Sequence, residues 1–120
     1  MRDNRDGTVT DEVTGLMWQQ EIPEKMTWDE AVSYCEKLNL GGYTNWRLPT
    51  IQELKTLVDY TSYIPAINIT YFPNTASSFY WSSTIHAYNT NYTWGVSFHY
   101  GDDHYYGKNN SYYIRAVREG

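Results

Sequence analysis

The chain has 120 residues, a formal net charge of −5, one cysteine and an aromatic content of 18%. At this length one domain is expected, large enough to bury roughly two-thirds of its unfolded surface without cross-links. The apolar runs are too short to cross a bilayer, the composition is not that of a disordered chain, and the acidic balance disfavours a general binder of nucleic-acid backbones.

Two short strands are predicted near the N-terminus. Turn signals at Asp6-Gly7 and Thr14-Gly15 precede residues 8–10 and 16–18, which have the composition of strands. Residues 3–7 resemble a calcium loop only faintly, because they lack alternating oxygen ligands and a distal glutamate. A hairpin turn is the better interpretation of this run.

Two helices are predicted next, each with its own start signal. Thr27 with Glu30, and later Thr50 with Glu53, fit capping boxes in which the hydroxyl and the carboxylate satisfy free backbone N–H groups. Gly41-Gly42 is expected to end the first helix. The apolar face of that helix contains Trp28, Ala31, Val32, Cys35 and Leu38.

From residue 80 onward the periodicity changes from about 3.6 to 2, which indicates strands. Strands are predicted at 80–84, 94–98 and 113–117, with turns at Gly101 and Gly107. In the middle strand Trp94, Val96 and Phe98 are expected to face the core, and Gly95, Ser97 and His99 to face away. This order predicts an α+β domain in which two helices pack on a twisted antiparallel sheet and the terminal strands pair.

Residues 85–113 have an unusual composition. Of these 29 positions, seven are Tyr, four are Asn and three are His, and the part of the chain from residue 80 on has no net charge. Tyr offers a large rigid contact area together with a hydroxyl, and Asn and Ser add adaptable hydrogen bonds, as in antibody paratopes. A binding surface is the favoured interpretation, and tyrosines that lean into an ordinary core are the alternative.

Other chemistry has weaker support in the sequence. The histidines have no metal-ligand spacing, and the adjacent carboxylates of Asp102-Asp103 would point to opposite faces of a strand. Cys35 lies on the apolar face of the first helix, so we expect a buried packing residue rather than a nucleophile. No metal and no cofactor are predicted.

Read in order, the motifs of the chain resemble a known family. They are 6–11, 14–18, Trp28 with Ala31 and Cys35, 41–43, Trp46-Arg47-Leu48-Pro49-Thr50 with Glu53-Leu54, 65–68, Phe72-Pro73, 80–84 and 113–118. This set resembles the family of the Legionella collagen-like protein C-terminal domain over nearly the whole chain. The resemblance implies a C-type-lectin-like fold, related to the formylglycine-generating enzymes, and a role in adhesion and ligand binding on bacterial surface or phage proteins.

A narrower resemblance concerns residues 94–101. Relatives often read Trp-Asn-Val-Asn-Phe-Asn-Asn-Gly there, whereas this chain keeps Trp, Val, Phe and Gly but has Gly95, Ser97, His99 and Tyr100 at the Asn positions. Codons for Asn reach these residues when only their adenines change. The pattern looks like a variable protein of a diversity-generating retroelement, in which mutagenesis directed at adenines rewrites a ligand-binding face.

The chain also departs from better-known relatives of that fold. Formylglycine-generating enzymes use a cysteine pair, but this chain has only Cys35, so the resemblance does not imply that activity. The Glu-Pro-Asn or Gln-Pro-Asp loop and the Trp-Asn-Asp strand of calcium-dependent lectins are absent. Some relatives bind sulfated polysaccharides, but the neutral second half offers little cationic surface for them.

The sequence thus predicts one domain over 1–120, with a scaffold at 1–84 and 113–120 and a candidate variable face at 85–112. We expect a non-enzymatic recognition domain for a protein or glycan ligand on a cell surface. The residues expected to contact this ligand are His86, Tyr88, Asn89, Asn91, Tyr92, Gly95, Ser97, His99, Tyr100, Asp102, His104, Tyr105, Tyr106, Asn109, Asn110 and Tyr112.

The expected location is a bacterial cell surface or a phage particle, where the domain would be part of a longer protein or a homo-oligomer such as a trimer. No signal peptide is expected in this chain, because residues 1–6 contain no apolar stretch. Neither nucleic-acid binding nor membrane insertion is predicted. The alternatives are a formylglycine-generating type of enzyme and an oligomerisation module that uses the aromatic face as its interface.

Overall fold

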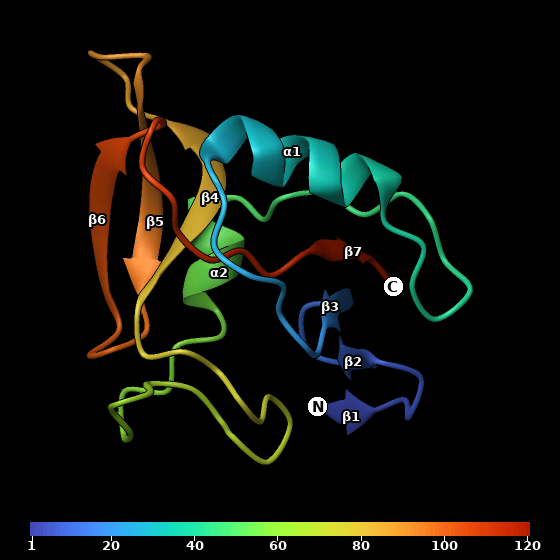
Figure 1. The fold of residues 1–120 in the computed structure, drawn as a ribbon. Coiled ribbons are helices and arrows are strands. Elements are labelled where there is room, and N and C mark those ends of the chain that lie inside the picture. Colours follow the sequence, from blue (N-terminus) through green and yellow to red (C-terminus); the bar gives the residue numbers. More distant parts are fainter.

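The computed structural model describes residues 1–120 and has an α+β architecture with two helices and two antiparallel sheets (Figure 1). The elements in chain order are β1 (Arg2–Asp3), β2 (Thr8–Asp11), β3 (Leu16–Gln19), α1 (Trp28–Lys37), α2 (Ile51–Lys55), β4 (Phe79–Ile85), β5 (Tyr92–Ser97), β6 (Asp102–Gly107) and β7 (Val117–Glu119). The sheets have the orders β1-β2-β3-β7 and β4-β5-β6. The α+β class is therefore confirmed, whereas the expectation of a single sheet was wrong.

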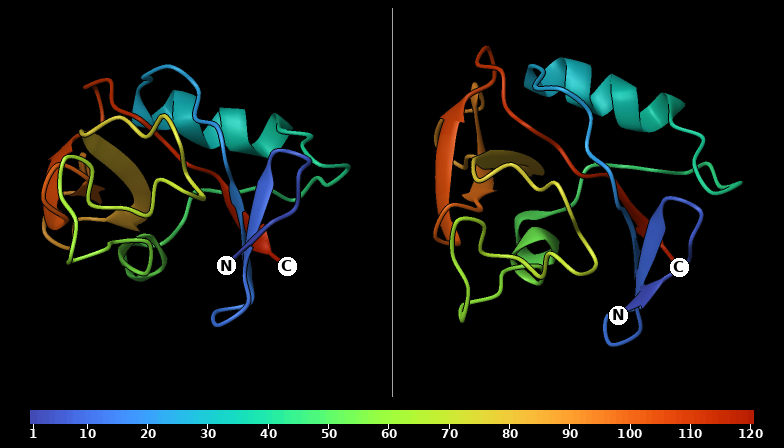
Figure 2. Two further views of the ribbon diagram at one scale, coloured as in Figure 1. Left: turned by 90° about the horizontal axis from the view of Figure 1, so that it is seen from below. Right: turned by 60° about the horizontal axis from the view of Figure 1, so that its bottom comes forward.

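The four-stranded sheet joins the two ends of the chain. The hairpin of β2 and β3 pairs Thr8 with Gln19, and β3 pairs in turn with β7. The closing strand thus pairs with the N-terminal hairpin, although it begins at Val117 and not at the predicted residue 113. Figure 2 shows both termini on this sheet, at the opposite end of the molecule from β6.

The sheets stay separate because the chain between them does not continue a ladder. Tyr113 makes only an isolated parallel bridge with Tyr80, and the next three residues, Ile114 to Ala116, are buried in the core. The segment 113–117 therefore connects the sheets instead of forming one strand.

Both predicted capping boxes are present. The Thr27 N–H donates to Glu30 Oε1 (2.9 Å), and in α2 the Thr50 N–H donates to Glu53 Oε1 (2.9 Å) while the Glu53 N–H donates to Thr50 Oγ1 (3.2 Å). The first helix ends at Lys37, earlier than predicted. The glycines 41–42 instead form a left-handed turn between Leu40 and Tyr43, whose backbones bond each other.

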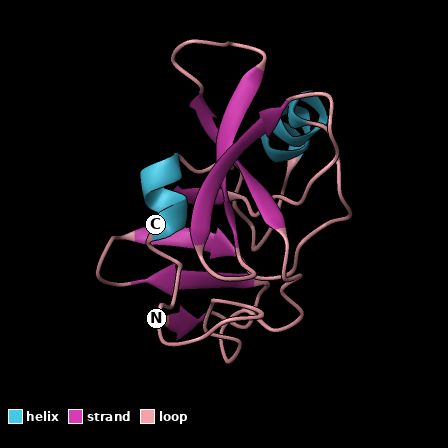
Figure 3. Cartoon of the chain, turned by 90° about the vertical axis from the view of Figure 1, so that its left-hand side faces the viewer, coloured by secondary structure: helices cyan, strands magenta, loops and turns pink.

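The three-stranded sheet lies between the two helices (Figure 3) and separates two hydrophobic clusters. The cluster on the α2 side contains Leu54, Tyr80 and Val96. The cluster on the α1 side contains Cys35 and Trp81. Successive residues of β4, from Phe79 to Trp81, enter opposite clusters, as the alternation of a strand requires, whereas β5 contributes Val96 to the α2-side cluster. None of the helices has the length and apolarity needed to span a bilayer.

A buried arginine ties three distant segments together. Arg115 is 1% exposed, and its guanidinium donates to the Gln19 carbonyl (2.8 Å) and to Thr75 Oγ1 (3.0 Å). It also lies over the ring of Phe72, 4.7 Å from the ring centre. Burial lowers its pKa to about 10, so the side chain remains a cation at neutral pH.

Candidate ligand-binding surface

The predicted binding residues lie on the three-stranded sheet and on the segments that join its strands. β5 and β6 pair continuously from Tyr92 opposite Gly107 to Ser97 opposite Asp102. This register places Trp94 beside Tyr105 on one face of the sheet. The next pair, Thr93 and Tyr106, therefore lies on the other face.

Five aromatic rings gather at one end of the sheet, on its α2 side. This sheet-end cluster consists of His86, Tyr88, Tyr92, Trp94 and Tyr105. The His86 ring centre lies 4.5 Å from that of Tyr105 and 5.7 Å from that of Trp94, on which it stacks. Tyr88 is 96% exposed, Tyr105 44% and Tyr92 38%, so the cluster presents aromatic surface to solvent.

The loop that carries two of these rings is held by its own hydrogen bonds. The His86 N–H donates to the Tyr92 carbonyl (2.9 Å), and the Tyr92 N–H donates to the Asn89 carbonyl (3.0 Å). The side-chain oxygen of Asn89 also accepts the Asn91 N–H (3.1 Å). These bonds give the loop a defined shape before any ligand arrives.

The turn after β6 lies at the same end of the sheet. The Lys108 N–H donates to the Asn91 carbonyl (2.9 Å), which joins this turn to the loop before β5. Asn109 and Asn110 are exposed, and the Asn110 side chain bonds the Gly107 carbonyl (3.1 Å). Amide groups thus lie at the same end of the sheet as the sheet-end cluster.

Other predicted residues lie on the α1 side of the sheet. Tyr106 and Tyr112 each lie 4.8 Å from the ring of Phe79, and burial raises the pKa of Tyr112. His104 lies on the same face, with its Nε2 at 2.6 Å from Asp102 Oδ2. Tyr112 packs against the α1-side core, whereas Tyr106 remains 37% exposed, so this face also presents some aromatic surface to solvent.

A third set lies at the far end of the sheet. His99 and Tyr100 occupy the turn between β5 and β6, and Tyr100 lies 6.2 Å from the ring of Tyr63. The His99 carbonyl accepts the Ile64 N–H (2.7 Å), and Ser97 is half-buried just before this turn. A ligand on the sheet-end cluster would not reach this turn without covering the length of β5.

The expectation that Gly95 faces outward was wrong. Gly95 is buried, and a Cβ built on it would lie 2.1 Å from the Tyr80 carbonyl oxygen and 2.4 Å from Cζ of Phe79. The Phe79 ring covers the place where a side chain would be, because β4 and β5 approach closely there. This position cannot contact a ligand through a side chain.

Trp94 was the residue that sequence reasoning missed. It was expected in the core with Val96 and Phe98, which are buried, but Trp94 is only half-buried and belongs to the sheet-end cluster. The alternation of strand 94–98 gives its face correctly. The signal for its exposure was its position near the end of the strand, where the core no longer covers that face.

The charged groups of this region are mostly paired. Asp103 Oδ2 lies 2.8 Å from Lys55 Nζ, and this hydrogen bond lowers the pKa of Asp103. Asp102 points to the opposite face, as its position in the strand predicted. Nowhere in the chain do three His, Cys, Asp or Glu side chains lie close enough to hold a metal ion.

Cys35 is buried in α1, as predicted. Burial raises the pKa of its thiol to about 12, so almost no thiolate forms at neutral pH. The arrangement around Cys35 is that of a packing residue.

Comparison with known proteins gives one family match. The sequence model of the family described as the Lcl C-terminal domain matches residues 7–118. The match includes both helices and the entire three-stranded sheet. A search of curated proteins finds no match to the chain.

Proposed function

We propose that this chain, which belongs to the Lcl C-terminal domain family, is a non-enzymatic recognition domain of a bacterial surface or phage protein. Membership of this family is consistent with an adhesion-type domain of a collagen-like surface protein. The ligand in this proposal is a protein or a glycan on a cell surface. The arrangement of a terminal hairpin closed by the last strand also supports a C-type-lectin-like fold.

The observation that carries this proposal is the sheet-end cluster. Its rings belong to the paired strands β5 and β6 and to a loop that is held by its own hydrogen bonds. Little conformational freedom is therefore lost when a ligand covers them. Tyr rings supply stacking area, and their hydroxyls with the nearby Asn amides supply hydrogen bonds. The same chemistry suits the apolar face of a sugar and the mixed surface of a protein.

The placement of the termini supports display of this surface. Both termini lie on the four-stranded sheet, away from β6 (Figure 2). A carrier attached there leaves the sheet-end cluster free, and several copies on one carrier would raise the avidity of weak individual contacts.

We also propose that the exposed positions of the face vary through a diversity-generating retroelement. Positions such as Tyr88, Asn89 and Asn109 are exposed and would accept new side chains without disturbing the core. Gly95 is excluded from this set by its packing. Deep sequencing of the locus in a clonal population should show changes limited to adenine-derived codons of exposed positions, whereas an unchanging segment over many generations would contradict the proposal.

The test of the recognition function uses the domain coupled through its C-terminus to a fluorescent tetramer. Glycan arrays and panels of bacterial and host cells are screened with the wild type and with a Tyr88→Ala, Tyr105→Ala double variant. We expect a loss of at least about tenfold in affinity for the selected target, because two exposed contact rings are removed.

Tyr60→Ala is the matched control for this test. Tyr60 is 75% exposed but lies outside the sheet-end cluster, so its loss should leave binding unchanged. Thermal unfolding should show that all three proteins remain folded. Equal binding by the double variant and the wild type would contradict the proposed site.

The second candidate function is an oligomerisation module. The observation that favours it is Ile85, which is 42% exposed directly before His86 and adds apolar area at the same end of the sheet. Analytical ultracentrifugation separates the two functions. A stable trimer that dissociates in the Tyr88→Ala, Tyr105→Ala variant would favour the module, and a monomer would favour the recognition surface.

A further inference from the structure

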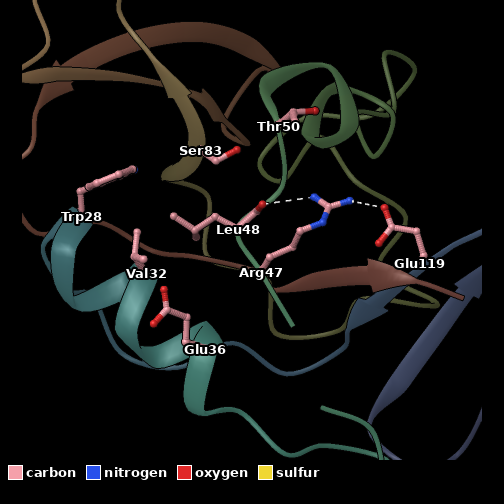
Figure 4. Close-up of a pocket in the computed structure, with 8 residues that line it drawn as sticks. All are labelled: Trp28, Val32, Glu36, Arg47, Leu48, Thr50, Ser83 and Glu119. Carbon is pink, nitrogen blue, oxygen red and sulfur yellow. Dashed lines mark hydrogen bonds and ion pairs between the residues drawn. The ribbon is translucent and has the colours of Figure 1, made fainter. Parts of the chain in front are cut away.

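A groove of about 560 Å³ lies on a part of the molecule that the predicted binding surface does not include. It is formed by α1, by the extended segment that leads into α2, by β4 and by β7 (Figure 4). Its lining residues are Trp28, Val32, Glu36, Arg47, Leu48, Thr50, Ser83 and Glu119. Volumes in the range of roughly 300–1,000 Å³ are typical of ligand sites.

The apolar part of the groove comes from α1 and from Leu48. Trp28, Val32 and Glu36 follow one another at four-residue spacing, so they lie on the same side of the helix (Figure 4). The Trp28 indole N–H donates to the Ser82 carbonyl (2.9 Å), which fixes the ring. Leu48 is buried at the base. These side chains offer a hydrocarbon-lined wall of fixed shape.

The charged part of the groove is negative overall. The Arg47 guanidinium donates two hydrogen bonds to Glu53 (2.7 and 2.8 Å) and one to Glu119 (2.9 Å). The two negative charges of these carboxylates together exceed the single positive charge of Arg47. Glu36 is exposed and takes part in no salt bridge. The groove thus combines an apolar wall with a net negative charge.

A cation lies over the ring of Trp28, although it is not one of the residues that line the groove. Lys108 Nζ is 4.5 Å from the centre of the Trp28 ring. Repulsion from this ammonium group would direct a second cation away from Trp28. The favourable positions are therefore next to Glu36 on α1 and Glu119 on β7, which lie on opposite sides of the groove (Figure 4).

We propose that this groove binds a lysine or arginine side chain of a partner polypeptide, with its methylene stem on Trp28, Val32 and Leu48 and its cationic head toward Glu36 and Glu119. Charge complementarity selects the basic head, and the apolar wall selects the stem. The volume exceeds that of one side chain, so neighbouring residues of the partner enter the groove as well. The exposed hydroxyl of Ser83 lies at the groove to bond the partner's backbone.

The test is a titration of the isotope-labelled domain, followed by NMR, with the peptide acetyl-Leu-Arg-Leu-amide. We expect saturable shifts at the Trp28 indole and at the amides of Val32 and Ser83. A peptide with neutral citrulline in place of arginine should bind more weakly, by up to about fivefold, because an exposed ion pair is worth up to about 1 kcal/mol. Equal affinity of the two peptides, or no saturable shift, would overturn the proposal.

Two further measurements refine the result. Glu36→Gln should lower the affinity for the arginine peptide by a factor of about 2–5. Glu12→Gln, which removes an exposed carboxylate in the β2–β3 turn, should leave this affinity unchanged. N-acetylarginine amide should bind more weakly than the peptide. If it binds equally well, the groove serves free organic cations and the assignment to a polypeptide partner is wrong.

Discussion

Gly95 lies where β5 passes beneath the Phe79 ring, and it determines how closely β4 and β5 can approach. Any side chain there would meet the Tyr80 carbonyl and the Phe79 ring, both of which are fixed by the core. We predict that Gly95→Ala lowers the free energy of unfolding by about 3 kcal/mol through overpacking, as measured by urea denaturation.

Gly107→Ala is the control for that prediction. The atoms nearest to a Cβ at Gly107 lie at 3.6 and 3.8 Å, which is ordinary contact, and its φ is not positive. The free energy of unfolding should therefore be clearly lower for Gly95→Ala than for Gly107→Ala. Equal stabilities would show that the sheet can move apart at Gly95, and the position would then be able to carry a side chain.

Glu53 gives stability that depends on pH. Hydrogen bonds from Arg47 lower the pKa of this carboxyl in the folded state. A carboxyl with a lowered pKa stabilises the fold fully above its unfolded pKa, and this contribution is lost as the pH falls through the folded value. Unfolding measured from pH 7 to pH 3 should thus show a smaller acid-induced loss in Glu53→Gln than in the wild type.

The glutamine variant isolates the charge, because glutamine keeps the capping-box geometry. At pH 7 it should be less stable than the wild type by about 1 kcal/mol. Glu12→Gln, which removes an exposed carboxylate that forms no salt bridge, should leave the pH profile unchanged. If the stability of the wild type and that of Glu53→Gln changed with pH in parallel, the pH dependence could not be assigned to the Glu53 carboxylate.

At the scale of elements, α2 depends on its cap more than on its length. It has only five residues, which is too short for a helix to be stable by itself. We predict that Thr50→Ala lowers the free energy of unfolding by about 1 kcal/mol, because the Glu53 N–H loses its acceptor. Thr70→Ala, at an exposed position whose hydroxyl makes no hydrogen bond, should cost less than half as much in the same denaturation experiment.

What could be predicted from the sequence follows the range of the interactions. The capping boxes and the first hairpin were predicted correctly, because each depends on residues within a few positions of one another. The separation into two sheets was not predicted, since it depends on residues 113–116 leaving the ladder for the core. The direction of Gly95 was wrong for a related reason: a strand's alternation shows which residues share a face, but not what covers that face.

The candidate site was predictable as a segment but not as a surface. Composition identified residues 85–112, and the register of β5 against β6 then distributed the tyrosines over both faces and both ends of the sheet. Tyr105 and Tyr106 are neighbours in sequence yet face opposite sides. Only three of the predicted tyrosines, Tyr88, Tyr92 and Tyr105, belong to the sheet-end cluster.

At the scale of the whole molecule, Arg115 joins parts that no sheet connects. Its bonds reach the end of β3 and the segment before β4, and no carboxylate lies among its hydrogen-bond partners. We predict that Arg115→Met lowers the free energy of unfolding by about 3 kcal/mol, because several buried acceptors lose their donor. Arg118→Met, which removes a half-buried arginine from β7, should cost about 1 kcal/mol or less by the same measurement.

The whole molecule also separates its two proposed sites. The sheet-end cluster lies on the α2 side of the three-stranded sheet, whereas the groove lies against α1, and none of the predicted binding residues lines it. The two sites share no residue. The two proposals can therefore fail independently.

The most direct test of the recognition surface is hydrogen–deuterium exchange of the domain, alone and bound to the target selected with the tetramer. The account predicts protection of amides in residues 86–93 and 104–110, at the end of the sheet where the rings gather. Protection confined to residues 28–36 and 47–50, or to residues 60–66 and 98–101, with none at the sheet end, would contradict it.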